Sequence, residues 1–320
     1  MADRFSRDIS YLRISITDLC NMRCQYCMPA DGIKKKDHQE LLSFEDIVSI
    51  VRSSVPLGIS KLRITGGEPL VRKGIINLIE QLAAIPEIKE IAMTTNGSFL
   101  KTMAEPLKDA GLTRFNISID SLRNDRYKEI TRGGNLQEVL EGIKTVLSLK
   151  MTPLKLNTVM IGGINDDEAG EFARLTMHDD IDVRFIELMP IGEASQWSKN
   201  RFISNDIIRE KLGLLVTEKT EPGSPATYYR LPGAKGRIGF INPISHHFCH
   251  ECNRLRLTSD GKLKPCLHSD DEIDLMPLLN QTGDKMTEMI AKAIELKPEK
   301  HGLNQKDPVY TRRNMCQIGG

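Results

Sequence analysis

The sequence predicts an α/β fold built on a parallel sheet. Short apolar segments, typical of buried strands, alternate with longer segments in which apolar residues recur every three or four positions. This alternation is typical of right-handed βαβ units, which place successive strands parallel. Polar and glycine-rich segments follow the strands at their carboxyl ends, where parallel sheets bind ligands. An open doubly wound sheet and an incomplete (β/α) barrel of six units both fit this pattern.

The first two thirds of the chain contain the strand and helix patterns of this sheet. The expected strands are Leu12–Thr17, Lys61–Thr65, Glu90–Thr94, Arg114–Ile119, Leu154–Met160 and Asp182–Leu188. The expected helices lie near residues 44–55, 72–84, 99–110, 135–150 and 166–178. Ser43 precedes the first of these helices and is expected to cap it, because a serine hydroxyl can accept a free backbone N–H.

The pattern changes after Gly213. Short strand candidates separated by proline and glycine turns predict an antiparallel meander, with members Leu214–Glu218, Thr227–Leu231 and Gly236–Ile241. A strand at Leu255–Thr258 and an amphipathic helix at Lys285–Leu296 follow. We therefore divide the chain into a core, residues 1–213, and a C-terminal α+β region, residues 214–320.

Composition limits the class of protein. A chain of 320 residues can bury a core without disulfides or metals. Its 44 Lys and Arg against 43 Asp and Glu argue against a surface that binds nucleic acid or membrane as a whole. No apolar run approaches the roughly 20 residues that a spanning helix needs, and no secretory signal is evident. We expect a soluble, cytoplasmic protein whose cysteines are reduced.

Three cysteines lie close together after the first strand: Cys20, Cys24 and Cys27. Three thiolates do not complete a tetrahedral zinc site, and His38 is the nearest further candidate ligand. A [4Fe–4S] cluster can be held through three of its irons, which leaves the fourth open to a small molecule. The spacing favours the cluster over zinc and over three unligated cysteines.

The segment CNMRCQYC resembles the cysteine motif of the radical S-adenosylmethionine (SAM) enzymes, including the aromatic Tyr26 before the last cysteine. Gly66-Gly67-Glu68-Pro69 resembles the GGE segment of the same superfamily. The resemblance implies an incomplete (β/α)6 TIM-type barrel, a [4Fe–4S] cluster on the first three cysteines, and SAM bound at its open iron. The SAM contacts that it implies fall on Tyr26, Gly67, Ser118 and Met189.

A second triad, Cys249, Cys252 and Cys266, lies near the other end of the chain, flanked by four histidines, His246, His247, His250 and His268. Spacing alone leaves zinc and an iron–sulfur cluster as alternatives. The surrounding segment FCHECNRLRLTSDGKLKPCL and the terminal Gly319-Gly320 resemble the GTP 3′,8-cyclase family of molybdenum cofactor biosynthesis, and this resemblance runs from Phe5 to Gly320. It implies a second [4Fe–4S] cluster whose open iron contacts guanine.

Several cations interrupt the apolar strands, where a charged side chain must face a cavity or a partner. The resemblance assigns GTP contacts to Arg13, Arg63, Thr94, Lys155, Arg254 and Arg256, and we add Arg184 because it lies on the sixth strand. Arg13 is placed with the first three cysteines among the catalytic residues. No Walker phosphate loop is present, so side chains are expected to hold the triphosphate.

The implied reaction is that of a radical SAM lyase. A 5′-deoxyadenosyl radical takes the ribose 3′ hydrogen of GTP, and the C3′ radical adds to C8 to give 3′,8-cyclo-7,8-dihydro-GTP. The implied partners are a low-potential donor of the flavodoxin or ferredoxin type and cyclic pyranopterin monophosphate synthase as product acceptor. A homodimer is compatible with the resemblance. The tail, Gly319 and Gly320, is expected to enter the active site.

Two other functions remain as alternatives: a peptide-modifying radical SAM enzyme with an auxiliary cluster, and a zinc-ribbon binding protein. Three residues outside the motifs are expected to have no part in the site. His178 and His301 are predicted to lie on the surface, and Cys316 is predicted to lie near a flexible end without partners.

Overall fold

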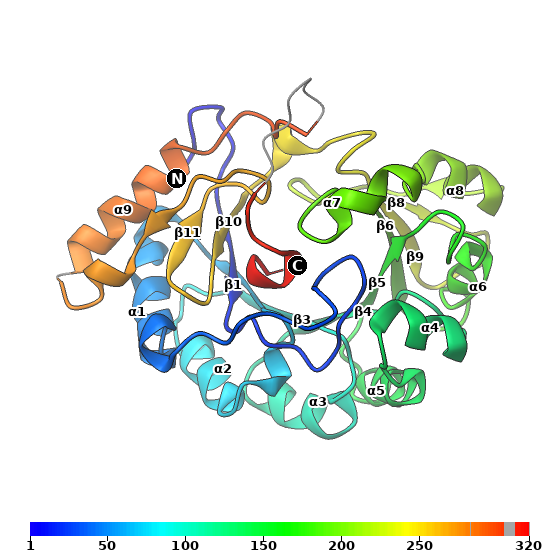
Figure 1. Ribbon diagram of the computed structural model, residues 1–320, viewed down its shortest axis with the longest axis horizontal. Coiled ribbons are helices and arrows are strands. Elements are labelled where there is room, and N and C mark those ends of the chain that lie inside the picture. The colour runs from blue at the N-terminus through cyan, green and yellow to red at the C-terminus, as the bar shows by residue number, and fades with distance from the viewer. Residues whose placement is uncertain (282, 304–310, 320) are drawn as a thin grey trace.

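A computed structural model describes residues 1–281, 283–303 and 311–319 of the chain (Figure 1). The strands in these residues form a twelve-stranded sheet with the order β12-β11-β10-β1-β2-β3-β4-β5-β6-β9-β8-β7. The core strands are β1 (Tyr11–Ser15), β2 (Lys61–Thr65), β3 (Glu90–Thr95), β4 (Arg114–Ser118), β5 (Leu154–Met160) and β6 (Ile181–Glu187). Each predicted core strand is confirmed, with ends that differ by at most two residues.

The order of the core strands decides between the two predicted architectures. Each strand from β1 to β6 pairs in parallel with the next one along the chain. A doubly wound sheet reverses its direction of growth at a switch point, and no such reversal occurs among β1 to β6. The connecting helices lie around the outside of the curved sheet (Figure 1). The core is therefore an incomplete barrel.

The helices that cover the sheet are amphipathic and bury their apolar faces against it. The bounds are α1 (Phe44–Ser54), α2 (Ile75–Ala83), α3 (Leu100–Asp109), α4 (Asn124–Thr131), α5 (Leu136–Ser148), α6 (Ala169–Arg174), α7 (Ala194–Trp197), α8 (Asn205–Leu212) and α9 (Gly283–Glu295). The predicted cap is confirmed, because the Ser43 hydroxyl accepts a hydrogen bond from the Asp46 amide at 3.0 Å. Helices α4, α7 and α8 were not expected from the sequence.

The C-terminal region adds strands to both edges of the core sheet. Its strands are β7 (Val216–Thr217), β8 (Ala226–Arg230), β9 (Arg237–Ile241), β10 (Arg254–Leu257), β11 (Lys262–Lys264) and β12 (Ile273–Asp274). The predicted antiparallel meander is confirmed for β7, β8 and β9, and β9 then pairs in parallel with β6. At the opposite edge β10 pairs in parallel with β1. Both junctions join residues that are distant in sequence.

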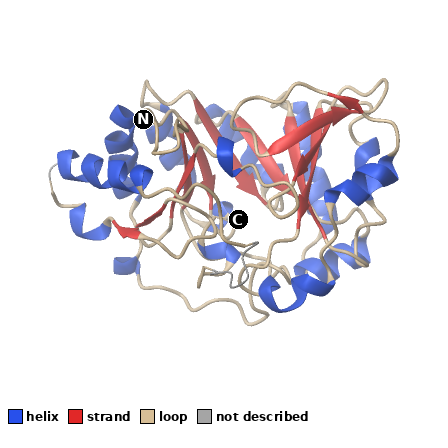
Figure 2. Cartoon of the chain, turned by 90° about the horizontal axis from the view of Figure 1, so that it is seen from above, coloured by secondary structure: helices blue, strands red, loops and turns tan. Residues whose placement is uncertain are grey.

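The chain returns to the middle of the molecule at its end. Helix α9 packs on α1, where the Thr287 hydroxyl donates to the Ser53 carbonyl at 2.9 Å. The last described segment forms a short 3₁₀ helix, Met315–Gln317. Figure 2 shows the C-terminal end between strands on either side of it. No helix in the described parts of the chain is long and apolar enough to cross a membrane.

Candidate active site

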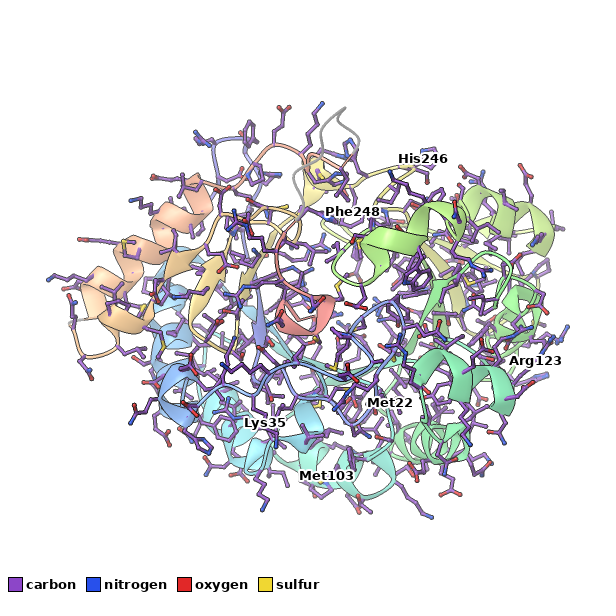
Figure 3. All side chains as sticks on the ribbon, viewed as in Figure 1. Met22, Lys35, Met103, Arg123, His246 and Phe248 are labelled. Carbon is purple, nitrogen blue, oxygen red and sulfur yellow. The ribbon has the colours of Figure 1, made fainter. Side chains whose placement is uncertain are left out.

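Both cysteine triads line one cavity of about 300 Å³, where the carboxyl ends of the core strands meet the C-terminal region. The predicted site residues on its wall are Arg13, Cys20, Cys24, Tyr26, Cys27, Arg63, Gly67, Thr94, Ser118, Arg184, Met189, Cys249, Cys252, Arg254, Arg256 and Cys266. Met22 and Phe248 also line the cavity, and in the view of Figure 3 they lie on either side of the C-terminal segment. Lys155 and Gly319 are not on the wall, and Gly320 lies outside the described residues.

The first triad lies on the loop that follows β1. The loop turns back on itself, and the Cys27 amide donates to the Cys24 carbonyl at 2.9 Å. Burial raises the pKa of the Cys20 thiol to about 11, and burial together with the Asp120 carboxylate raises the pKa of Cys24. Thiolates in such surroundings need a cation beside them. Three thiols on one short loop therefore fit an iron–sulfur cluster as a donor set.

The GGE segment packs directly on this cysteine loop. A Cβ atom on Gly67 would lie 2.3 Å from the Leu19 carbonyl oxygen and 2.6 Å from that of Asp18. The Glu68 amide donates to the Leu19 carbonyl at 2.8 Å, which ties the two loops together. Only glycine permits so close an approach of two backbones. The nearest neighbour of Gly67 in the structure is thus the loop that carries Cys20.

Two buried carboxylates stand near the first triad. Glu68 accepts hydrogen bonds from the Asn96 amide at 2.7 Å and the Thr95 hydroxyl at 2.8 Å, and burial raises its pKa to about 7. Asp120, after β4, accepts from the Tyr26 hydroxyl at 2.7 Å, and burial raises its pKa to about 6. Asp120 lines the cavity, whereas Glu68 is not on its wall and acts on Cys20 from beside it. The Asp120 carboxylate suits a ligand that carries positive charge.

The opposite side of the cavity is basic. Sheet register places Arg256 beside Arg13 and Arg13 beside Arg63 on three adjacent strands. Burial and the neighbouring Arg254 lower the pKa of Arg256 to about 10, and burial and Arg256 lower that of Arg13. Cations that crowd together in this way are stabilised by an anion placed among them. The arrangement fits a polyphosphate.

Two further residues predicted to contact GTP, Arg184 and Thr94, have buried polar atoms in the cavity wall that are not satisfied by hydrogen bonds within the described chain. Among the described residues no hydrogen bond reaches the buried Nε of Arg184 or the buried hydroxyl of Thr94. The Arg184 side chain is buried, at 4% exposure, although it carries a charge. Buried polar atoms normally have partners, so both atoms are available to a ligand.

Lys155 lies behind the wall of the cavity. Its ammonium is 3.9 Å from an Asp182 carboxylate oxygen and 3.5 Å from the Tyr228 hydroxyl. Burial, then the charge of Arg184, lowers its pKa to about 7. The arginines predicted to contact GTP all line the described cavity wall, whereas Lys155 does not.

The second triad is formed by two separate segments. Cys249 begins a short 3₁₀ helix and Cys252 ends it just before β10, whereas Cys266 follows β11. Burial tends to raise the pKa of Cys252, but the charges of Arg254 and Lys297 outweigh burial and lower it to about 6. Burial raises the pKa of Cys249, so the charges that favour the thiolate act mainly at Cys252. Three cysteines brought together in this way fit a metal group as a donor set.

Sequence reasoning missed two residues beside the second triad, His301 and Lys297, and both lie on the cavity wall with the flanking His268. The prediction that His301 is a surface residue is wrong. It is buried, at 8% exposure, and its Nε2 lies 2.8 Å from the Pro243 carbonyl oxygen. Its ring also contacts that of His268, with centroids 4.8 Å apart. A histidine in a polar segment gives no sequence signal for such a position.

The prediction that Cys316 has no partners is also wrong. Its side chain is buried, at 1% exposure. Its neighbours Met315 and Ile318 belong to a small apolar cluster that packs against Cys27. A side-chain hydrogen bond with Cys316 is the largest contribution to the raised pKa of Cys27. The end of the chain is therefore packed against the first triad.

The described part of the tail contacts two of the predicted GTP residues. Arg13 donates to the Gly319 carbonyl at 2.6 Å, and Arg256 donates to the Ile318 carbonyl at 3.1 Å. Gly319 has φ +77°, and a Cβ atom on it would lie 2.6 Å from the Thr65 methyl carbon. Both observations require glycine at this position.

Family models match most of the chain. Residues 14–176 match the radical SAM superfamily, and residues 181–303 match the molybdenum cofactor synthesis C family. The junction between the two matches falls at the start of β6, before the predicted boundary at residue 213.

Full-length relatives are more specific. The GTP 3′,8-cyclase of Alkaliphilus metalliredigens is 61% identical over 320 residues, all of both chains. That of Peptoclostridium acidaminophilum is 52% identical, over 100% of this chain and 98% of its own. Among solved structures, Streptococcus suis SuiB bound to the precursor peptide SuiA has a TM-score of 0.62 at 15% identity, over 97% of this chain and 76% of that one, which shows the shared fold. The chain belongs to the GTP 3′,8-cyclase family of the radical SAM superfamily.

Proposed function

We propose that this chain is a radical SAM lyase that converts GTP to 3′,8-cyclo-7,8-dihydro-GTP, the first step of molybdenum cofactor biosynthesis. One observation carries the proposal: two cysteine triads from opposite ends of the chain line the same cavity as five arginines. Full-length identity of up to 61% to proteins named GTP 3′,8-cyclase supports the same activity.

Cys20, Cys24 and Cys27 would hold a [4Fe–4S] cluster, with SAM at its open iron. When bound, this pair supplies a 5′-deoxyadenosyl radical, which is chemistry that no amino-acid side chain provides. Tyr26, Gly67, Ser118 and Met189 are the proposed SAM contacts, and all four line the cavity from different parts of the fold. Tyr26 is oriented by its hydrogen bond to Asp120.

Cys249, Cys252 and Cys266 would hold a second [4Fe–4S] cluster that binds the guanine end of GTP. The proposed triphosphate contacts lie on β1, on its neighbours β10 and β2, and on β3, β5 and β6. They are Arg13, Arg63, Thr94, Lys155, Arg184, Arg254 and Arg256. Arginine can donate two parallel hydrogen bonds to a phosphate, which fixes both position and orientation. The chain's own task is to hold the ribose of GTP facing SAM and to keep water out.

We also propose how the parts of the chain divide this work. Residues 1–213 bind SAM and supply most of the GTP contacts, and residues 214–320 supply the second cluster together with Arg254 and Arg256. The tail, Gly319 and Gly320, completes the pocket beside Arg13 and Arg256. A low-potential flavodoxin or ferredoxin would supply electrons, cyclic pyranopterin monophosphate synthase would accept the product, and the chain could act as a homodimer.

The decisive experiment is anaerobic turnover of the reconstituted protein. With SAM, GTP and dithionite we expect 5′-deoxyadenosine and 3′,8-cyclo-7,8-dihydro-GTP, identified by mass spectrometry, from protein with about eight irons per chain. SAM cleavage without any change in GTP would contradict the proposed substrate. About four irons plus one zinc would contradict the second cluster, which in that case would be a zinc site.

A further inference from the structure

Lys297 is a buried cation for which the proposed reaction has not yet given a role. It lies two residues after the end of α9, is 2% exposed, and lines the cavity beside the second triad. Its ammonium donates to the Arg254 carbonyl and to the Pro265 carbonyl, each at 2.7 Å. Arg254 is two residues after Cys252, and Pro265 directly precedes Cys266. One ammonium therefore bridges the two segments that carry the triad.

The charge of Lys297 has no carboxylate partner in the described parts of the chain. Lys264 is a useful comparison, because it is equally buried but pairs with Glu272 at 3.0 Å. The remaining contact of Lys297 is a side-chain hydrogen bond to the thiol of Cys252. A buried charge is costly unless it is paired. The residues that could balance Lys297 are the three cysteines of the second triad, as thiolates.

We propose that Lys297 is a positioning residue of the second cluster, which holds the two triad segments together and raises the reduction potential of the cluster through its bond to Cys252 sulfur. This inference rests on the proposed function, because it needs a cluster at the second triad. It concerns the protein's control of that cluster and not the identity of the substrate.

The physical reason is the change in charge on reduction. Reduction adds one electron to the cluster, so a nearby cation stabilises the reduced form more than the oxidised form. Hydrogen bonds to the sulfur atoms and the local net charge are two of the terms that set the potentials of iron–sulfur clusters. Because Lys297 is excluded from water, solvent does not screen its charge from the triad.

The experiment measures the potential of the second cluster alone. In the full chain, Cys20, Cys24 and Cys27 are replaced with alanine, so that iron can bind only at the second triad. Lys297→Met is compared with Lys297→Arg and with Lys264→Met, which removes an equally buried lysine two residues before Cys266 whose charge is paired with Glu272. Iron and sulfide are counted, and the potential is read from a redox titration followed by electron paramagnetic resonance.

We expect Lys297→Met to lower the ratio of reduced to oxidised cluster about tenfold at a fixed applied potential, equal to a shift of about 59 mV for one electron. Lys297→Arg should restore most of the shift, and Lys264→Met should shift the potential less, because the charge of Lys264 is already balanced by Glu272. A Met variant with full iron and the parent potential would overturn the inference. So would an equal shift in Lys264→Met.

Two further outcomes are distinguishable from these. If Lys297→Met does not fold, Lys297→Gln takes its place, since its amide keeps a donor for the carbonyls but carries no charge, and an unchanged potential there would overturn the inference. If the parent chain with the first triad removed binds no iron, the second cluster of the proposed function is wrong, and the inference about Lys297 falls with it.

Discussion

The two cysteine triads face one cavity from opposite sides, and their electrostatic surroundings differ in sign. Burial and Asp120 raise the pKa of Cys24 in the first triad, where Asp120 lines the cavity and Glu68 acts on Cys20 from outside the wall. In the second triad burial raises the pKa of Cys249, but at Cys252 it is outweighed by Arg254 and Lys297, and the pKa of Cys252 falls to about 6. The two triads thus differ most at Cys24, which has a carboxylate beside it, and at Cys252, which has two cations beside it.

This difference matches the charges of the two proposed ligands. SAM carries a sulfonium and an ammonium group, which favour the acidic side, whereas the triphosphate of GTP requires the basic side. A cavity with one sign of charge would bind both ligands less selectively. The asymmetry therefore explains how a chain with a net charge of only +1 can bind a polyanion and a cation next to each other.

The largest expected effect separates the two triads. Cys24→Ala should abolish SAM cleavage, because the first cluster and its open iron are lost. Cys252→Ala should abolish cyclisation of GTP but leave measurable, uncoupled SAM cleavage, because the acidic side of the cavity is intact. The measurement is 5′-deoxyadenosine and cyclised product formed under dithionite.

Cys316→Ala is the matched control, since Cys316 is buried next to Cys27 but belongs to neither triad. It should retain both clusters. Release of 5′-deoxyadenosine by Cys24→Ala at the parent rate would show that the first triad is not the SAM site, and the comparison would then fail.

A second prediction tests whether the tail, Gly319 and Gly320, is part of the GTP site beside Arg13 and Arg256. Residues added after Gly320, or deletion of both glycines, should abolish cyclisation while both clusters stay intact. Gly319→Ala should lower the rate about tenfold or more, because a left-handed residue costs about 1–2 kcal/mol and the new Cβ would lie 2.6 Å from Thr65. The rate is measured by product formation at saturating GTP.

Gly233→Ala is the control for this substitution. Gly233 has φ +78°, the same strained conformation, but no atom lies within 4 Å of its position for a Cβ. It should keep the parent rate. If a tagged protein cyclises GTP as fast as the untagged one, the tail is only an end of the chain.

The third prediction concerns the cations of the basic side. Arg256→Ala should weaken GTP binding by about 1.5–3 kcal/mol, roughly 10- to 150-fold, while SAM binding stays near the parent value. Isothermal titration under anaerobic conditions measures both affinities. Arg209→Ala is the control, because Arg209 is exposed on α8 and does not line the cavity. Equal losses for SAM and GTP would mean that Arg256 supports the whole fold.

The sequence predicts only part of the arrangement that brings the two triads to one cavity. Both triads and the six core strands could be predicted, because cysteine spacing and apolar periodicity are local signals. The parallel pairing of β10 with β1 could not, since it joins residues more than two hundred positions apart, and this pairing is what places Arg256 beside Arg13. Non-local pairing leaves no periodic trace in the sequence.

Lys297 and helix α4 were missed for the same reason, because the local sequence gives no sign that their side chains are buried. Lys297 stands before a proline at the end of an amphipathic helix, a position where an exposed lysine is common. Helix α4 was missed because its sequence, NDRYKEIT, is mostly polar and buries only Tyr127, Ile130 and Thr131. In both places tertiary packing overrides the local pattern, and burial is known only from the structure.

The smallest expected effect is a pH dependence that Lys155 gives to GTP binding. Burial holds its pKa at about 7, with Arg184, Arg114 and Arg63 also disfavouring the charged form and Asp182 favouring it. Phosphate favours the ammonium, so GTP binding takes up a proton above pH 7. The dissociation constant of GTP should therefore rise by up to about tenfold per unit between pH 7 and pH 9, since each pH unit above the pKa makes the charged form tenfold rarer. Lys155→Arg should remove this slope, because the guanidinium stays charged throughout the range. The same slope in both proteins would assign the titration to another group. It would show that Lys155, behind the cavity wall, does not contribute its charge to GTP binding.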